Sequence, residues 1–354
     1  MISAIMNSKG IKDTRITSRT PLVSPVQLSI DIAQPVEHEE FVRRSRKTIE
    51  DIMSGRDERI IIIVGPCSIN DKYAAIEYAR KLKSLSDEVK DKYFIVMRTY
   101  FEKPRTTLGW KGLINDPDIN ATYKINDGLR LARTILQGIT DAGLPCATEY
   151  VNSLVIPDYT AEYISWAAIG ARTVESQEHR ELVSGLSMPV GFKNDRFGNI
   201  EGAIDAVLTS RGKHTFIGTA DYGGGAIIET KGHDYTHIIL RGGKEPNYER
   251  THVIAAQEQL RKAKLPDIVM IDCSHGNSNK DYKNQPIVFN DIIRQRRDGN
   301  NKIIGIMVES NHKEGQYKLP EDLREFDKTK MPYGVSCTDS CMGWDDTVRM
   351  IKNS

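Results

Sequence analysis

The feature that most constrains the fold is a repeated alternation of short apolar runs with longer amphipathic stretches. The eight apolar runs are residues 59–68, 93–101, 145–151, 164–172, 189–194, 236–243, 267–277 and 302–310. Helical spacing of apolar residues occurs between several of them, as in residues 73–89 and 125–143. Such a pattern indicates an α/β protein whose parallel sheet is covered on both faces. Eight units predict a (β/α)8 TIM barrel, and a doubly wound open sheet is the alternative.

Two segments depart from this alternation. Residues 1–58 are polar, contain three prolines and show helical spacing only over residues 38–54. We expect them to form an N-terminal extension, an arm followed by a helix, that serves oligomerisation or regulation and precedes a catalytic barrel over residues 59–354. Residues 214–232 have the pattern of two strands around DYGGG. They predict a β-hairpin inserted before the sixth barrel strand.

Composition narrows the class of protein. The 354 residues are 39% hydrophobic and 27% charged, as in ordinary soluble proteins. The net charge of +1 argues against nucleic acid or a membrane as a partner. Five cysteines without a CxxC pair favour a reducing compartment over a disulfide framework. No signal-peptide core or membrane-spanning run is present in the sequence, so we expect a cytoplasmic protein.

Cationic side chains follow strand after strand in this pattern. The six cations are Arg98, Lys103, Arg105, Arg172, Lys193 and Arg241. Each one alone is more often a solvated surface charge. In a barrel, however, the carboxyl ends of the strands converge on the face where active sites are built. The set therefore predicts a binding wall for more than one phosphate, or for a phosphate and a carboxylate.

A second group of strand-end residues has the chemistry of metal ligands. Its members are Cys67, His275, Glu309 and Asp339. A thiolate, an imidazole and carboxylates suit Zn, Fe, Mn or Co. In the alternative interpretation, Cys67 is a small buried apolar residue and Asp339 caps a helix that starts near residue 342. We expect Cys337 and Cys341 to pack rather than bind metal, and His179 to be an exposed helical residue.

Seven long motifs occur in a fixed order. They are GPCSIND (65–71), MRTYFEKPRTTLGWKGLINDP (97–117), GARTVESQEHRELVSGLSMPVGFKN (170–194), HIILRGGKEPNY (237–248), IDCSHGNSNKDYKNQP (271–286), MVESN (307–311) and YGVSCTDSCMGW (333–344). Together they closely resemble the type I 3-deoxy-D-arabino-heptulosonate 7-phosphate (DAHP) synthases, in the feedback-regulated microbial and fungal branch. The resemblance extends from about residue 40 to the end of the chain. It implies a metal-dependent, aldol-like condensation of phosphoenolpyruvate with erythrose 4-phosphate, the first step of the shikimate pathway to aromatic amino acids.

The resemblance also implies roles for individual residues. One divalent metal ion (Mn, Fe, Co or Zn) would be bound by Cys67, His275, Glu309 and Asp339. Phosphoenolpyruvate would lie against Arg98, Lys103, Arg172, Lys193 and Arg241. The phosphate of erythrose 4-phosphate would meet Arg105 and Thr106, and Glu149 would line the same pocket. Arg98, Lys103 and His275 are the predicted catalytic residues.

Feedback regulation is a further implication of the resemblance. An aromatic amino acid effector would bind beside the inserted hairpin, at Pro157, Ser187, Phe216 and Gly218. Glycine at the position of Gly218 accompanies tyrosine-sensitive forms in the family, so tyrosine is favoured as the effector. In the alternative, Phe216 and Gly218 simply pack and bend a strand. The family also implies a homodimer or homotetramer in which the N-terminal arm crosses between subunits.

The sequence departs from the family pattern in two places. After Phe-Lys-Asn the family commonly has Gly-Thr-Asp-Gly, whereas this chain has Asp195, Arg196, Phe197 and Gly198. The segment between Glu309 and Asp339 is a few residues longer than in close relatives.

Two other functions compete with the predicted one. A related synthase uses arabinose 5-phosphate, which the KPRTT motif argues against, and a non-catalytic sensor of phosphorylated metabolites would have lost a ligand or a substrate cation.

Overall fold

The computed structural model describes residues 12–153 and 156–354, so the first 11 residues of the predicted N-terminal extension lie outside it. The strands are β1 Ile60–Gly65, β2 Tyr93–Arg98, β3 Cys146–Glu149, β4 Ile164–Ile169, β5 Val190–Lys193, β6 Thr215–Thr219, β7 Gly225–Glu229, β8 Thr236–Leu240, β9 Val269–Asp272 and β10 Ile303–Glu309. The helices are α2 Pro25–Asp31, α3 Val36–Met53, α4 Lys72–Val89, α5 Ile125–Asp141, α6 Ile156–Thr160, α7 Gln177–Val183, α8 Glu201–Ser210, α9 Arg250–Lys262, α10 Gln285–Arg297 and α11 Trp344–Lys352.

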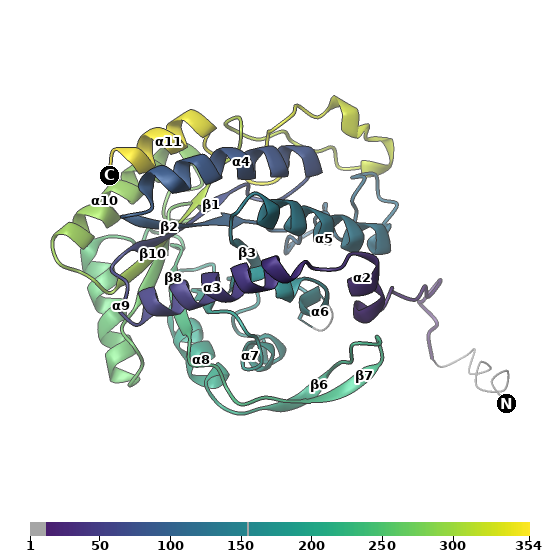
Figure 1. Cartoon of the computed structure of the whole chain (residues 1–354), viewed down its shortest axis with the longest axis horizontal. Helices are drawn as coiled ribbons and strands as arrows, with labels where there is room; N and C mark the ends of the chain where they lie inside the picture. Colours follow the sequence, from purple (N-terminus) through teal and green to yellow (C-terminus); the bar gives the residue numbers. More distant parts are fainter. Residues whose placement is uncertain (1–11, 154–155) are drawn as a thin grey trace.

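Eight of the strands close into a parallel barrel. Its order is β1-β10-β9-β8-β5-β4-β3-β2, with β1 paired to β10 and to β2. Helices surround the barrel in Figure 1. The eight apolar runs of the sequence correspond in order to these eight strands. The predicted (β/α)8 barrel is therefore confirmed, and the open sheet is excluded.

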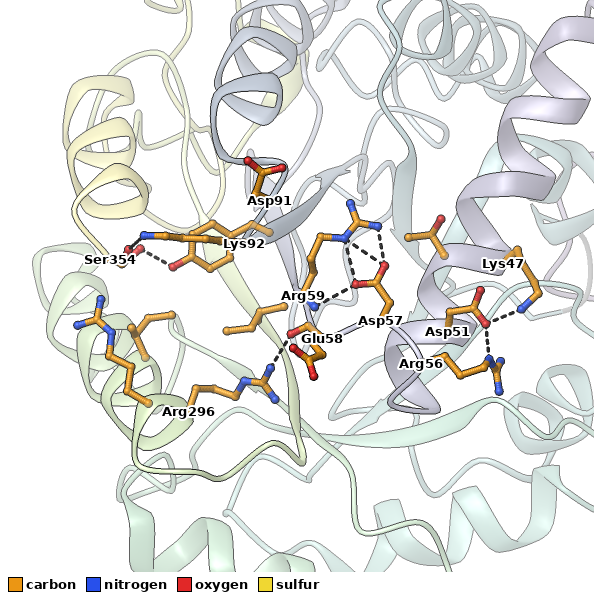
Figure 2. A pocket seen from close by; sticks show the side chains of 15 residues that line it. Lys47, Asp51, Arg56, Asp57, Glu58, Arg59, Asp91, Lys92, Arg296 and Ser354 are labelled. Carbon is orange, nitrogen blue, oxygen red and sulfur yellow. Dashed lines mark hydrogen bonds and ion pairs between the residues drawn. The ribbon is translucent and has the colours of Figure 1, made fainter.

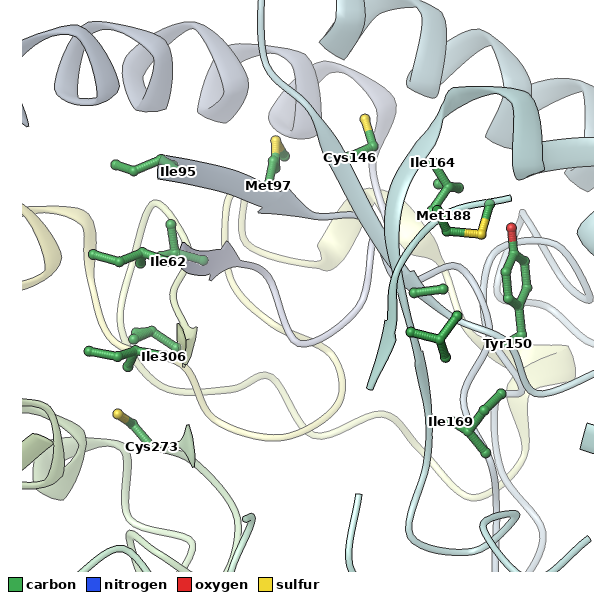
Figure 3. Packing of buried hydrophobic residues seen from close by; sticks show 14 of the residues in the cluster. Ile62, Ile95, Met97, Cys146, Tyr150, Ile164, Ile169, Met188, Cys273 and Ile306 are labelled. Carbon is green, nitrogen blue, oxygen red and sulfur yellow. The ribbon is translucent and has the colours of Figure 1, made fainter. Parts of the chain in front are cut away.

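Alternate residues of each strand face two different cores. Ile62 lies in register with Ile306 on one side and Ile95 on the other. Figure 3 shows these three side chains in a row, and they belong to the cluster that packs against the helices. Ile61 and Ile63 belong instead to a separate buried cluster inside the barrel. This alternation follows from the period of two along a strand, and it explains why the strands are apolar on both faces.

Helix α3 contributes to the core inside the barrel. Its residues Ile49, Ile52 and Met53 are buried in the same cluster as Ile61 and Ile63. In Figure 1 the helix runs between α4 and α5 on one side and α7 and α8 on the other. The apolar face predicted within residues 38–54 thus packs against the barrel. The division of the chain into an extension and a barrel domain stays a prediction.

The stretch 214–232 contains two antiparallel strands outside the barrel. Strand β6 pairs with β7 from Thr215–Glu229 to Thr219–Gly225. Gly223, in the connection between them, has a φ of +90°, which a residue without a Cβ adopts readily. The two strands follow α8 and precede β8, the sixth strand of the barrel in chain order. Figure 1 shows them curving away from the barrel past α7.

One expectation about a helical residue is wrong. His179 does lie on a helix, α7, but it is buried rather than exposed. Its Nε2 lies 3.0 Å from the carbonyl oxygen of Val151 and its Nδ1 lies 2.8 Å from Ser176 Oγ. The short helix presents this face to the loop after β3, and burial lowers the pKa of His179.

Across the described part of the chain, none of the helices combines the length and the apolar character needed to span a bilayer.

Candidate active site

The sequence-predicted residues converge at the carboxyl end of the barrel. A hollow of about 530 Å³ opens there. Its walls include Lys103, Arg105, Glu149, Arg172, Lys193, Arg241, His275, Glu309 and Asp339. Cys67 and Arg98 are fully buried and contact wall residues from behind. Thr106 lines a smaller adjoining hollow together with Arg172. The carboxyl ends of seven strands, or the loops that follow them, thus line one site, and Cys67 after β1 lies behind its wall.

Three potential metal ligands lie close together in this site. The sulfur of Cys67 and carboxylate oxygens of Glu309 and Asp339 are all within 4.8 Å of one another. Burial raises the pKa of the Cys67 thiol to about 12, and Glu309 adds to this effect. A nearby cation favours the thiolate, and Lys103 Nζ lies 3.1 Å from the sulfur. Sulfur and carboxylate donors together fit a borderline divalent metal ion.

His275 stands at the edge of this cluster. Its backbone is left-handed, with a φ of +59°, which is uncommon for a residue with a side chain. Its Nδ1 lies 3.0 Å from Asp272 Oδ2 and 2.8 Å from Ser274 Oγ. Its Nε2 lies 3.9 Å from Glu309 Oε1. A carboxylate at Nδ1 favours the tautomer in which Nε2 carries the free lone pair, as in metal-binding histidines.

Arg98 is fixed by contacts on every side. Its Nη2 lies 3.0 Å from Glu309 Oε1, and its Nε donates to the carbonyl oxygen of Pro66 at 3.3 Å. The guanidinium also lies 3.8 Å from the centre of the Tyr100 ring. A buried arginine without partners would be very costly, so these contacts explain how β2 can end in a charge. Arg98 therefore presents a fixed positive charge beneath the pocket.

Lys193 bridges two buried carboxylates. Its Nζ lies 3.2 Å from Asp272 Oδ2 and 3.6 Å from Glu149 Oε2. Burial raises the pKa of both carboxyl groups, but nearby positive charges outweigh this effect. The pKa of Glu149 is lowered chiefly by Lys193, and that of Asp272 by His275 and Lys193. Both carboxylates are thus ionised at neutral pH, and they hold Lys193 in place.

Other cations of the pocket have no acidic partner. Within residues 12–153 and 156–354, Arg105, Arg172 and Arg241 form no ion pair. Arg105 Nε donates to the carbonyl oxygen of Trp110 at 2.7 Å, and Arg172 Nε donates to Thr106 Oγ1 at 3.1 Å. Arg241 is largely buried, which lowers its pKa without neutralising it. Charged guanidinium groups without an acidic partner favour phosphate or carboxylate ligands.

A larger hollow at the opposite end of the barrel has a different charge arrangement. It has a volume of about 930 Å³ and contains several arginines and lysines (Figure 2). Arg59 pairs with Asp57 at 2.6 Å. Asp51 accepts from both Lys47 at 2.5 Å and Arg56 at 2.6 Å, as the dashed lines of Figure 2 show. Lys47, Arg56 and Arg59 already have acidic partners, and Arg296 donates to the backbone carbonyl oxygens of Glu58 and Asn301, so this hollow is a weaker candidate for a polyanionic substrate.

The four predicted effector residues line a third hollow. Pro157, Ser187, Phe216 and Gly218 all face a space of about 740 Å³ beside the paired strands β6 and β7. Gly218 has little room for a side chain, since a Cβ there would lie 2.6 Å from Ile228 Cγ1. Phe216 and Gly218 therefore lie on the wall of a cavity, next to the helices α6 and α7.

Sequence reasoning missed Asp272 and did not assign a role to Arg196. Asp272 is fully buried, and the signal for it was a charge within the apolar run 267–277. Arg196 lines the pocket, and it stands in the stretch that departs from the family pattern. Cys337 and Cys341 are buried and lie outside the group of three ligands, as expected. Cys341 Sγ accepts a hydrogen bond from the backbone N–H of Cys67 at 3.4 Å.

Comparison with known proteins agrees with the motifs. The family model described as "DAHP synthetase I family" matches residues 30–352. The Tyr-sensitive phospho-2-dehydro-3-deoxyheptonate aldolase of Escherichia coli K12 is 45% identical over 98% of this chain and 96% of its own length. The Phe-sensitive one from the same strain is 48% identical over 96% and 95%. The structure of a phospho-2-dehydro-3-deoxyheptonate aldolase from Francisella tularensis superimposes with a TM-score of 0.91, at 48% identity, over 95% of this chain and 96% of that one. This chain is a member of the DAHP synthetase I family.

Proposed function

We propose that this protein condenses phosphoenolpyruvate with erythrose 4-phosphate to give DAHP and inorganic phosphate. The observation that carries the proposal is the group formed by Cys67, Glu309 and Asp339, which lies beside cations without acidic partners in one pocket. The reaction requires an electrophilic aldehyde and two phosphorylated substrates. The names of the relatives, phospho-2-dehydro-3-deoxyheptonate aldolases, support the same reaction.

The depth of four residues in the pocket supports their substrate-binding roles. Arg98 and Lys193 are buried, so they suit the carboxylate and phosphate of phosphoenolpyruvate at the base of the site. The family resemblance, rather than depth, adds Lys103, Arg172 and Arg241 to this set. Arg105 and Thr106 are exposed at the mouth and suit the phosphate of erythrose 4-phosphate. Cations fixed at two depths would hold the substrates in the orientation for carbon–carbon bond formation.

We assign one divalent metal ion to Cys67, His275, Glu309 and Asp339. When bound, such an ion would act as a Lewis acid on the aldehyde oxygen of erythrose 4-phosphate. Asp272 orients His275, with Nδ1 held at 3.0 Å, so that Nε2 faces the other ligands. Lys103 lies 3.1 Å from the Cys67 sulfur and stabilises its thiolate form.

The same residues account for the remaining chemistry. The C3 carbon of phosphoenolpyruvate attacks the aldehyde carbon, water adds at C2, and phosphate leaves by cleavage of the C–O bond. Charge then develops on the departing phosphate and on the new hydroxyl group. Lys103 and Arg241 are placed to stabilise the phosphate charge, since both lack a carboxylate partner in the described part of the chain.

We further propose that an aromatic amino acid inhibits the enzyme from the hollow beside β6 and β7. Tyrosine is the favoured effector because glycine at the position of Gly218 accompanies tyrosine-sensitive forms in the family that the sequence resembles. Overall similarity does not decide this, since relatives named Tyr-sensitive and Phe-sensitive are 45% and 48% identical to this chain. A homodimer or homotetramer, a regulatory N-terminal extension and a cytoplasmic location belong to the same proposal.

The test is release of inorganic phosphate from phosphoenolpyruvate and erythrose 4-phosphate. The assay is run with a chelator, then with added Mn²⁺, and in parallel with arabinose 5-phosphate. Metal-dependent release with the four-carbon sugar alone is the expected result. Release with arabinose 5-phosphate instead would favour the related synthase. No release with Mn²⁺, Fe²⁺, Co²⁺ or Zn²⁺ would contradict catalysis and favour a metabolite sensor.

A further inference from the structure

We propose that Arg196 is an additional ligand for the phosphate of the four-carbon sugar. The inference rests on the proposed function and extends it, because the family pattern has a threonine in place of Arg196. It adds a second guanidinium, beside that of Arg105, to the predicted ligands of this phosphate at the mouth of the pocket. The phosphate would then be bound by loops after two strands, β2 and β5.

The geometry around Thr106 carries the inference. The hydroxyl oxygen of Thr106 lies 3.1 Å from Arg172 Nε and 3.5 Å from Arg196 Nη1. Arg196 lines both the main pocket and the adjoining hollow of about 290 Å³ that Thr106 helps to form. Two guanidinium groups from separate loops therefore converge on one hydroxyl that is itself a predicted phosphate ligand. An anion between them would relieve their mutual repulsion.

Arg196 is not neutralised by its neighbours. In residues 12–153 and 156–354, neither Arg172 nor Arg196 has an ion-pair partner. The adjacent Asp195 is used within its own loop, where its Oδ1 accepts from the backbone N–H groups of Phe197 at 2.8 Å and Asn199 at 2.9 Å. Glu175 lines the smaller hollow but pairs with neither arginine. The contrast with Arg59, which is held by Asp57 at 2.6 Å, indicates a site built for an external anion.

The loop that carries Arg196 is held in a defined turn. The N–H of Asp195 donates to the carbonyl oxygen of Asn199 at 3.1 Å, and Gly198 has a φ of +100°. This turn places Arg196 at its tip, where the guanidinium is exposed to solvent. A planar fork at this position can donate two hydrogen bonds to phosphate oxygens.

The depth of Arg196 assigns it to the outer phosphate. Lys193, three residues earlier in the same segment, is 3% exposed and contacts Asp272 at the base of the pocket. Arg196 instead lies at the rim beside Thr106. A residue at the rim should affect affinity for erythrose 4-phosphate and leave affinity for phosphoenolpyruvate unchanged.

The experiment compares wild-type enzyme with Arg196→Gln, and with Arg44→Gln as a matched control. Arg44 is exposed on α3 and has no ion pair within the described residues. Steady-state kinetics give KM for each substrate, and calorimetry gives the affinity for erythritol 4-phosphate, which lacks the aldehyde. For Arg196→Gln we expect about a tenfold higher KM for erythrose 4-phosphate and about tenfold weaker binding of erythritol 4-phosphate. The KM for phosphoenolpyruvate should not change, and Arg196→Lys should recover part of the loss.

The outcomes separate this inference from the proposed function. A wild-type enzyme without turnover would overturn the proposed function. Equal binding of erythritol 4-phosphate by wild type and Arg196→Gln would overturn the role of Arg196 while leaving catalysis intact. Equal losses for both substrates would also overturn it, since they would indicate a general disturbance of the pocket.

Discussion

Nδ1 of His275 lies 3.0 Å from Oδ2 of Asp272, a fully buried carboxylate that also contacts Lys193. One side chain thus connects a proposed metal ligand with a proposed substrate-binding cation. Replacing Asp272 with Asn keeps its shape but removes the charge that fixes the His275 tautomer. We expect Mn²⁺ affinity to fall about 10- to 100-fold, with a similar loss of activity at limiting metal. Titration of the chelator-treated protein with Mn²⁺ measures the affinity, and Asp91→Asn, at an exposed position, is the control.

Metal removal gives a second prediction. Wild-type enzyme treated with a chelator should lose activity and regain it on addition of Mn²⁺. Cys67→Ala removes the only sulfur in the group formed with Glu309 and Asp339. This variant should stay inactive at Mn²⁺ concentrations that fully restore the wild type. Full recovery by Cys67→Ala would show that the thiol is a packing residue, as in the alternative interpretation of the sequence.

Gly112 allows its backbone to pack closely against the backbone of Phe101, at the start of the loop that carries Lys103 and Arg105. Its φ is +108°, and a Cβ there would lie 2.1 Å from the carbonyl oxygen of Phe101. Gly112→Ala should lower the free energy of unfolding by about 2–4 kcal/mol and displace the loop. Gly299→Ala is the matched control, because its φ is +100° but nothing lies within 4 Å. Equal losses in urea unfolding would assign the whole effect to φ and none to the contact.

His237 predicts a loss of stability in mild acid. It is buried inside the barrel, where its Nε2 accepts from Trp166 Nε1 at 3.1 Å and its Nδ1 lies 3.0 Å from the carbonyl oxygen of Ile238. Burial lowers the pKa of His237 from 6.5 to about 4. The folded state therefore binds fewer protons than the unfolded state between these values, so stability is full above pH 6.5 and falls as the pH drops toward 4. The contribution is about 3 kcal/mol.

The measurement is urea unfolding of wild type and His237→Gln between pH 4 and 7. Glutamine keeps an acceptor for Trp166 but does not titrate in this range. The difference in unfolding free energy between the two proteins should shrink as the pH falls. A constant difference would mean that His237 does not titrate with folding.

The residue at position 218 is expected to affect whether tyrosine or phenylalanine inhibits more strongly. Serine at this position would place its Cβ 2.6 Å from Ile228 Cγ1 and narrow the hollow beside β6 and β7. Gly218→Ser should therefore weaken inhibition by tyrosine relative to phenylalanine, roughly tenfold if one buried polar contact is lost. Inhibition curves with both amino acids measure the shift. Gly225→Ser, on the partner strand with nothing within 4 Å, should leave both curves unchanged.

Local patterns predicted the fold well, because each barrel strand is apolar on both faces. Ile60–Gly65 and Ile303–Glu309 stand out in the sequence for this reason. The inward and outward cores could not be assigned, since a strand that is buried on both sides shows no alternation. His179 illustrates another limit, because a polar residue on a short helix gives no sign of the loop that will cover it.

The candidate site was predictable where it relied on motifs and strand ends. Cys67, Glu309 and Asp339 do converge, although up to 272 residues separate them along the chain. Asp272 was missed because a single acid at the end of a strand gives no sequence signal that it will contact both His275, three residues later, and Lys193 on another strand. From the sequence, Arg196 could be identified only as a departure from the family pattern. Its proposed role in phosphate binding depends on how close its loop lies to Thr106, which the sequence does not give.

The packing of α3 bears on where this chain can be cut. Ile49, Ile52 and Met53 share the buried cluster inside the barrel with Ile61 and Ile63. A shortened chain that began at Arg59 would leave the apolar residues at one end of the barrel open to water. We therefore expect the change in sequence pattern at residue 58 not to coincide with a gap between folding units, and a minimal catalytic fragment to require α3.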